Sequence, residues 1–209
     1  YDFRGNPKYS TMITKLCEFG PRSDFIIQVI KDLLEENPEK QIMVLAHNRA
    51  LLTYLHDAVL YRISNEPDIV GYYVGGMKEK DLKITESKRI VLATYAMAAE
   101  ALDIKTLSTL VMATPKTDIE QSVGRILRTR GQNPIVVDIV DSHDYLKRQW
   151  QKRKTFYKKC NYKIFSVVST EFQRFQENAP MWKLDYDPKS KVKEEKPKYK
   201  CLINVSFDD

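Results

Sequence analysis

The sequence predicts an α/β fold in which a parallel β-sheet carries helices on both faces. Two observations lead to this prediction. Short apolar runs of strand length alternate along the chain with longer segments whose apolar residues have helical spacing. The run at residues 89–93 is almost wholly apolar, as expected for a strand that is buried on both faces.

Capping and turn signals define the first elements. Residues 1–20 show no firm period. Ser23-Asp24 can cap a helix that the Asn37-Pro38 pair ends. Three elements then follow: a strand at residues 41–46, a helix with apolar positions at 51–59, and a strand at 69–74.

The second half of the chain continues this alternation. Thr117 and Glu120 fit a capping box, so we expect a helix to begin there, and we expect Gly131 to end it. The other expected elements are a strand at 89–93, a short turn or helix at 96–101, a strand at 107–113, a last buried strand at 134–140 and a helix from 142 to about 157.

The strand ends predict where function lies. In a parallel sheet, the carboxyl ends of the strands meet at one edge, and functional groups gather there. Five residues fall just past the ends of the expected strands and should share this edge. They are His47, Gly75, Thr94, Thr114 and Asp141.

Composition limits the function classes. The chain has 209 residues and 43% hydrophobic residues, which is enough for one core. No apolar run approaches the ~20 residues that a membrane-spanning helix needs. The three cysteines match no zinc or disulfide spacing, which favours a reducing compartment, and no metal site is expected in this chain. No signal peptide is visible and the first residue is not Met, so we interpret the chain as part of a longer protein.

The net charge of +6 is concentrated in one segment. Residues 147–163 contain eight Lys or Arg residues and no acid, so the remainder of the chain is slightly negative. Such a patch fits a polyanionic partner. The segment also contains Trp150, Phe156 and Tyr157, for which two interpretations remain open: rings that stack on nucleic-acid bases, or a buried helix stripe with solvated lysines around it.

The stretch from Asp118 to Arg128 carries the strongest chemical signal. Gln121, Arg125 and Arg128 share one face of the expected helix, which suits an anion near a helix start. Gly124 lies mid-helix, where it costs about 1 kcal/mol relative to Ala. The alternative is a solvated helix face. The opposite, core-facing side should hold Val123, Ile126 and Leu127.

Three segments in order resemble helicase motifs. Gln121-x-x-Gly124-Arg125-x-x-Arg128 is similar to motif VI of the superfamily 2 helicases, residues 90–104 resemble motif V, and residues 41–48 resemble motif IV. The sequence of these segments, together with residues 72–78, is most similar to helicases of large cytoplasmic DNA viruses. That group includes the poxvirus transcript-release helicase and its giant-virus and asfarvirus relatives. The resemblance covers roughly residues 22 to 165.

The resemblance implies a RecA-like domain that completes an ATP site. Arg125 and Arg128 would be arginine fingers, with Gln121 near the phosphates or the attacking water. The residues that would contact the nucleotide are Asp103, Glu100, Ala101 and Gly124. Alternatively, Asp103 is an acid in a loop that accepts hydrogen bonds from the backbone. Ala101 stands where many relatives have Gly. Mg²⁺ would be bound mainly by an N-terminal RecA-like domain that is absent from this sequence.

The resemblance also implies contacts to a nucleic-acid backbone. Thr94, the His47-Asn48-Arg49 turn and the Gly75-Gly76 pair would make them, without reading base sequence. Asn48 could instead cap the next helix, and Gly75-Gly76 could be a simple turn. The partner polymer would be DNA, or RNA or a hybrid, and the viral transcription machinery is a further expected partner; no membrane is expected.

The nucleotide-binding half of such an enzyme is absent from the sequence. The segment at residues 71–78 faintly echoes a Walker A loop, but Met77 stands where Lys is required, and no acidic metal-binding box occurs. We therefore expect this chain alone to hydrolyse no ATP. The alternative function is a helicase-derived domain that binds nucleic acid or a transcription partner without catalysis. The expected location is the viral factory in the host cytoplasm, and the virion.

We expect three parts in the chain. Residues 1–21 form an entry segment from a preceding domain, residues 22–168 form the RecA-like domain, and residues 169–209 form a C-terminal extension. The Lys-rich part of that extension, residues 185–200, is expected to be a disordered tail.

Overall fold

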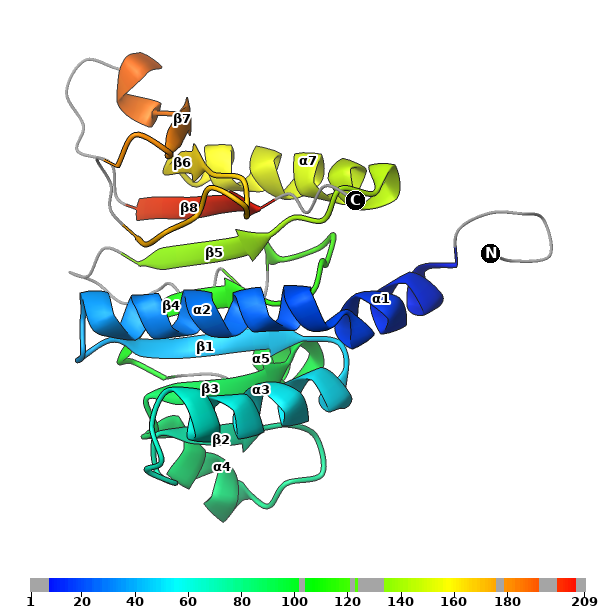
Figure 1. Ribbon diagram of the computed structural model, residues 1–209, viewed down its shortest axis with the longest axis vertical. Helices are drawn as coiled ribbons and strands as arrows, with labels where there is room; N and C mark the ends of the chain where they lie inside the picture. The colour runs from blue at the N-terminus through cyan, green and yellow to red at the C-terminus, as the bar shows by residue number, and fades with distance from the viewer. Residues whose placement is uncertain are drawn as a thin grey trace.

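The computed structural model describes residues 8–101, 104–120, 123, 134–175, 179–191 and 199–205. Its centre is an eight-stranded sheet with the strand order β2-β3-β1-β4-β5-β8-β6-β7 (Figure 1). Every neighbouring pair is parallel except β6 and β7, which are antiparallel. The predicted α/β fold with a parallel sheet and helices is confirmed.

The helices and strands alternate in the first two thirds of the chain. In order, they are α1 (Tyr9–Glu18), α2 (Gly20–Glu36), β1 (Gln41–Ala46), α3 (Arg49–Arg62), β2 (Val70–Tyr73), α4 (Glu79–Glu86), β3 (Ile90–Thr94), α5 (Tyr95–Ala101), β4 (Leu107–Met112), β5 (Ile135–Ile139), α7 (Asp144–Lys159) and β6 (Tyr162–Ser166). After them come β7 (Lys183–Tyr186), a 3₁₀ turn (Pro188–Lys191) and β8 (Tyr199–Val205).

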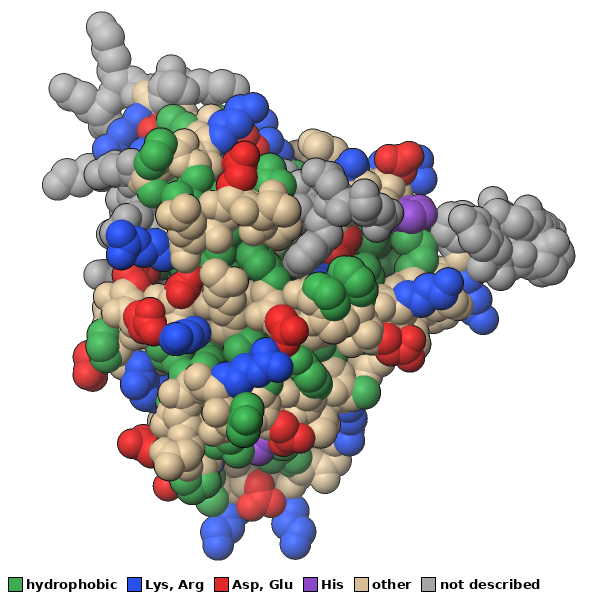
Figure 2. Space-filling view, in the orientation of Figure 1, with side chains coloured by type: hydrophobic (Ala, Val, Ile, Leu, Met, Phe, Trp, Pro, Cys, Tyr) green, Lys and Arg blue, Asp and Glu red, His purple; other side chains and the backbone are tan. Residues whose placement is uncertain are grey.

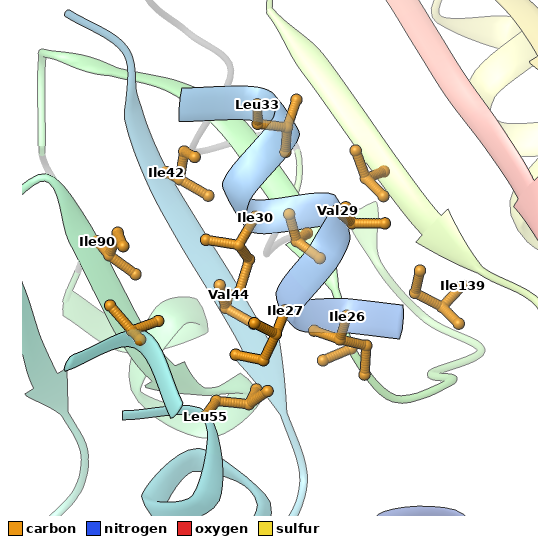
Figure 3. Packing of buried hydrophobic residues seen from close by; sticks show 14 of the residues in the cluster. Ile26, Ile27, Val29, Ile30, Leu33, Ile42, Val44, Leu55, Ile90 and Ile139 are labelled. Carbon is orange, nitrogen blue, oxygen red and sulfur yellow. The ribbon is translucent and has the colours of Figure 1, made fainter. Parts of the chain in front are cut away.

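Two hydrophobic clusters fill the two faces of the sheet. Along β1, Ile42 and Val44 belong to the cluster under α2 and α3, whereas Met43 and Leu45 belong to the cluster under α5 and α7. Figure 3 shows Ile26, Ile30 and Leu33 of α2 packed over this first face. Because successive strand residues point to opposite faces, an almost continuous apolar run is needed to bury both of them.

Several local predictions about the N-terminal part are wrong. Residues 9–18, without a firm period in sequence, form α1. Helix α2 begins at Gly20, with Pro21 in its first turn, so Ser23 and Asp24 lie inside the helix and do not cap it. Pro is well suited to a first helical turn, where its absent N–H costs nothing. Helix α4 was not predicted; its residues are mostly polar, and Thr85 is its only buried residue.

The C-terminal part departs furthest from expectation. The strand at 134–140 exists as β5 but is not the last, because β6, β7 and β8 follow it. Part of the expected tail at 185–200 is regular structure, since β7, the 3₁₀ turn and β8 fall within or overlap it. Strand β8 lies between β5 and β6 in the sheet, where it pairs with both. The domain limits at residues 21 and 168 stay predictions, although Phe172 and Trp182 join the core cluster under α2.

Candidate functional site

The carboxyl edge of the sheet gathers the five expected residues. His47 follows β1, Gly75 lies beyond β2, Thr94 ends β3, Thr114 lies beyond β4, and Asp141 lies beyond β5. These five strands are consecutive neighbours in the sheet and run parallel. The prediction that their ends share one edge is confirmed. In Figure 1 this is the edge toward which helix α1 extends.

His47 ties the end of β1 to the end of β4. Its backbone N–H donates to Oγ1 of the buried Thr114 at 3.0 Å, and its ring Nδ1 lies 2.9 Å from the same oxygen. The ring also lies 4.7 Å from the ring of Tyr95. Burial, and then the nearby charge of Lys116, lower the pKa of His47 below its usual value. The imidazole is therefore neutral near pH 7 and offers hydrogen bonds without a positive charge.

The residues beside His47 carry out structural roles in this structure. Asn48 caps α3, because its side-chain oxygen accepts from the N–H of Ala50 at 2.7 Å, as the alternative interpretation held. Arg49 donates from its guanidinium to the carbonyl of Gly75, so it links the start of α3 to the turn after β2. Arg49 is nevertheless exposed, which leaves much of its fork open to solvent.

Gly75 and Gly76 form a turn, as the second interpretation held for this pair. Gly76 has φ +85°, which residues with a Cβ rarely adopt. A Cβ built on Gly75 would lie 3.7 Å from the Arg49 guanidinium and 3.9 Å from the Met97 sulfur, so that position has ordinary contact space. The nucleic-acid role of this turn, and of the half-buried Thr94, stays a prediction.

Two buried arginines meet buried aspartates near this edge. Arg22 of α2 donates to both carboxylate oxygens of Asp141, at 2.6 and 3.0 Å. Arg153 of α7 donates to both oxygens of Asp138 in β5, at 2.7 and 2.8 Å. Although burial alone would lower the pKa of Arg153, the Asp138 carboxylate raises it, so this guanidinium stays charged.

Sequence reasoning missed Arg22, Arg153 and Asp138 as paired groups. One signal existed, because Asp138 interrupts an otherwise apolar run at residues 135–140. A buried carboxylate in a central strand requires a cation or several donors nearby. Asp141, expected at the shared edge as a functional acid, is committed to Arg22.

The segment with the motif VI signature is described only at its start. The Glu120 N–H donates to Asp118 Oδ1 at 3.3 Å, so the expected capping box with Thr117 is wrong. Val123 is fully buried, which confirms its predicted core position. The other residues assigned to the nucleotide, Gln121, Gly124, Arg125, Arg128 and Asp103, lie outside the described residues, as do the side chains of Glu100 and Ala101.

Helix α7 carries most of the basic segment, and its aromatic side is a buried stripe with lysines around it. Trp150 and Tyr157 are 2% and 0% exposed and belong to the core cluster, so their rings are not open to bases. Lys154 and Lys163 pair with Asp185 and Asp187 at 2.8 and 3.4 Å. The exposed cations of the helix are Lys147, Arg148, Lys152, Lys158 and Lys159.

The face covered by α2 and α3 differs from α7 in its charge. Figure 2 shows acidic and basic side chains interspersed over that face. Some of them pair there: Arg62 with Asp24 at 2.5 Å, and Lys40 with Glu36 at 3.0 Å. A mixed surface of this kind attracts a polyanion only weakly.

A small acidic cavity lies at the opposite end of α2. It has a volume of about 240 Å³ and is lined by Asp32, Glu35, Glu36, Arg174 and Phe175. Burial, and then the Glu35 carboxylate, raise the pKa of Asp32 to about 6. Within the described parts of the chain, no group of three or more His, Cys, Asp or Glu side chains is placed to hold a metal ion. No helix among those parts is long and apolar enough to cross a membrane.

The chain has relatives among viral helicases. No protein-family model matches it. It is 38% identical over 172 residues to a protein of Acanthamoeba polyphaga mimivirus named "Putative ATP-dependent RNA helicase L396", a match that covers 79% of this chain and 32% of the relative. It is 30% identical over 192 residues to QP509L of African swine fever virus, described in the same words, with 83% and 38% covered. The chain therefore spans about a third of the length of these curated relatives.

Solved structures agree on the fold. The crystal structure of T4 UvsW matches with a TM-score of 0.57 at 20% identity, covering 74% of this chain and 36% of that chain. The C-terminal part of the Fun30 ATPase domain matches with a TM-score of 0.51 at 8% identity, covering 68% and 53%. Relatives and folds together confirm the resemblance to helicases of large DNA viruses that the motifs indicated: this chain is a relative of their putative ATP-dependent RNA helicases and has a RecA-like fold.

Proposed function

We propose that this chain is the C-terminal domain of an ATP-dependent viral helicase and supplies one wall of a nucleotide site shared with an N-terminal RecA-like domain. One observation carries the proposal: five parallel strand ends meet at a single edge, and the segment with the motif VI signature begins there, after Thr114. An open α/β sheet binds its ligand at this edge. The family relationship supports the same conclusion.

The described start of the motif VI segment fits one side of a nucleotide site. A helix begins at Glu120, past the end of β4, and the N–H groups of a helix start suit phosphate oxygens. In this proposal Mg²⁺ is held mainly by the N-terminal domain, as the helicase resemblance implies. ATP, when bound, supplies the phosphoanhydride whose hydrolysis drives opening and closing of the two domains.

The motif VI residues stabilise negative charge on the phosphates of the nucleotide. Arg125 and Arg128 place guanidinium groups against the phosphates and stabilise the negative charge that develops there, an effect worth about 10³ to 10⁵ in rate. Gln121 orients the phosphates or the attacking water. Asp103, Glu100, Ala101 and Gly124 contact the nucleotide from the same edge.

The same edge contacts the backbone of one nucleic-acid strand. Thr94, His47, Asn48, Arg49 and the Gly75-Gly76 turn provide hydroxyl, imidazole, amide, guanidinium and backbone groups that bind sugar and phosphate without reading bases. The polymer is DNA, RNA or a hybrid, in viral transcription or DNA processing, in the cytoplasmic factory and the virion. The named function of the mimivirus relative favours RNA among these.

The test is nucleic-acid-stimulated ATP hydrolysis by the complete protein. Arg125→Ala and Arg128→Ala should each lower kcat by about 10³-fold or more, and Lys substitutions should restore little, because an ammonium lacks the guanidinium fork. Arg62→Ala is the matched control: it removes a surface guanidinium on α3 that pairs with Asp24 and should leave turnover unchanged. Wild-type turnover in both motif VI variants would end the arginine-finger assignment.

A further inference from the structure

Four consecutive backbone carbonyls lead from β4 toward the motif VI helix, and each accepts a hydrogen bond from a side chain of a different helix. The Ala113 carbonyl accepts from Arg22 at 2.8 Å, and the Lys116 carbonyl accepts from Arg153 at 3.1 Å. The Thr114 carbonyl accepts from the hydroxyl of Tyr95, and the Pro115 carbonyl accepts from the hydroxyl of Tyr9. We call residues 113–116 the carbonyl run.

This arrangement is unusual for a connection outside helices and strands. Carbonyls in such segments ordinarily face water, since no ladder or helix provides partners for them. Here the donors come from α1, α2, α5 and α7, and α2 and α7 cover opposite faces of the sheet. The carbonyl run is therefore held from both faces and from the edge.

The donors are themselves fixed. Both arginines are almost fully buried, and each uses its remaining fork on an aspartate: Arg22 on Asp141 and Arg153 on Asp138. Tyr95 is 3% exposed, and its burial raises its pKa, so its hydroxyl keeps its proton and remains a donor. A bidentate guanidinium is a rigid support, because its planar fork fixes the direction of every donor.

The carbonyl run leads directly into the first turn of the motif VI helix. Ile119 and Val123, which flank this turn, are 2% and 0% exposed, and the Val123 N–H donates to the Ile119 carbonyl at 2.8 Å. The start of the helix is thus attached to the core and to the carbonyl run. Only residues 117–119 separate the carbonyl run from this turn, so we expect a displacement of residues 113–116 to reach the helix start.

We propose that Arg22, Arg153, Tyr95 and Tyr9 are positioning residues for motif VI: by holding the carbonyl run, they set where Arg125 and Arg128 stand relative to the nucleotide. This rests on the proposed function. The two buried arginines and the two tyrosines then contribute to turnover as well as to stability. Displacement of a catalytic group by about 1 Å can cost about 10²-fold in rate.

The experiment compares two buried tyrosines in the complete protein. Tyr95→Phe removes one hydroxyl that bonds the carbonyl run. Tyr73→Phe is the matched control, since Tyr73 is 2% exposed and its hydroxyl bonds Glu86 at 3.2 Å, beside β2 and away from motif VI. Both variants keep ring volume and lose one hydrogen bond, so they should lose similar stability.

The two variants should differ in turnover. We expect Tyr95→Phe to lower kcat about tenfold, with little change in the KM for ATP or nucleic acid, and Tyr73→Phe to change kcat less than twofold. Tyr9→Phe should fall between them. Arg153→Lys should show the same loss of kcat if the variant folds. If it does not fold, the comparison of Tyr95→Phe with Tyr73→Phe is the test.

A double-mutant cycle separates this inference from the proposed function. In an Arg125→Ala background, Tyr95→Phe should have no further effect on kcat, because its action passes through motif VI. Equal kcat for Tyr95→Phe and Tyr73→Phe, with Arg125→Ala strongly impaired, overturns the positioning role alone. Wild-type turnover in Arg125→Ala overturns the proposed function instead. Independent, additive losses in the cycle also overturn the positioning role.

Discussion

The carboxyl and amino edges of the sheet differ in how they hold buried charged groups. At the carboxyl edge, Arg22 and Arg153 each meet a carboxylate and a backbone carbonyl. At the amino edge, buried atoms of Asp32 and Arg89 have no hydrogen-bond partner among the described residues. An unpaired buried group costs stability, whereas a paired one fixes geometry. The difference concerns charged groups alone, since Gln149 Oε1 of α7, near the carboxyl edge, also has no partner among the described residues, and Gln41 at the amino edge is fully hydrogen-bonded.

The largest expected effect is loss of Arg153. Arg153→Met leaves Asp138, whose side chain is 0% exposed, as an uncompensated buried charge that still accepts from the Tyr157 hydroxyl. The free energy of unfolding should fall by about 3–5 kcal/mol, measured by urea denaturation. Arg153→Met with Asp138→Leu should recover part of this loss, because no charge remains buried. Lys152→Met, on the exposed side of the same helix, should change stability by less than about 0.5 kcal/mol.

Arg22→Met should cost less than Arg153→Met. Its partner Asp141 has 6% side-chain exposure and lies past the strand end, so water can reach the freed carboxylate more easily. We expect a loss at the low end of about 3–5 kcal/mol in the same denaturation experiment. A larger loss from Arg22→Met than from Arg153→Met would show that access of water to the freed carboxylate does not rank these two pairs.

At the amino edge, removing a buried charge should raise the stability of the chain instead of lowering it. The pKa of Asp32 is raised to about 6 from its usual 3.8, so between these values the folded chain binds more protons than the unfolded chain. Stability from this group therefore falls as pH rises from 3.8 to 6. Asp32→Asn should stabilise the chain near pH 7–8 and lose that advantage below pH 3.8. Denaturation across this range measures it, with Glu39→Gln, which removes an exposed carboxylate just after α2, as control; a destabilised Asp32→Asn at pH 7 would contradict the assignment.

The smallest effect concerns one surface cation at each edge. Arg49→Ala removes an exposed guanidinium at the carboxyl edge, and Lys88→Ala removes an amine that pairs with Asp68 before β3, at the amino edge. If the nucleic-acid strand follows the carboxyl edge, only Arg49→Ala should reduce the slope of log binding constant against log salt, by about 0.7–0.9. Equal slopes in filter binding would remove Arg49 from the contact set.

The central strands could be predicted because their burial leaves a local record. Residues 42–46 and 90–93 are apolar throughout, and the residues after them fall at the carboxyl edge in any parallel sheet. Strand β8 could not be predicted, since its place between β5 and β6 depends on distant partners and its neighbourhood is rich in Lys. Partner strands decide such pairings, and propensity alone does not.

The candidate site divides in the same way. Its strand-end residues followed from topology, and motif order indicated the family. The supporting residues did not follow, because Arg153 lies within a run of cations that look alike in sequence. Only the fold shows that this one faces Asp138 while Lys152 faces solvent. Charge in a sequence does not reveal which cation is buried.

The most direct measurement is amide hydrogen exchange at Val123 and at β2 in Tyr95→Phe and Tyr73→Phe. If side chains hold the carbonyl run, and through it the first turn of the motif VI helix, Tyr95→Phe should speed exchange at Val123 and leave residues 71–73 unchanged. Tyr73→Phe should do the reverse. Unchanged exchange at Val123 in Tyr95→Phe, or the same acceleration at both places, would contradict the account.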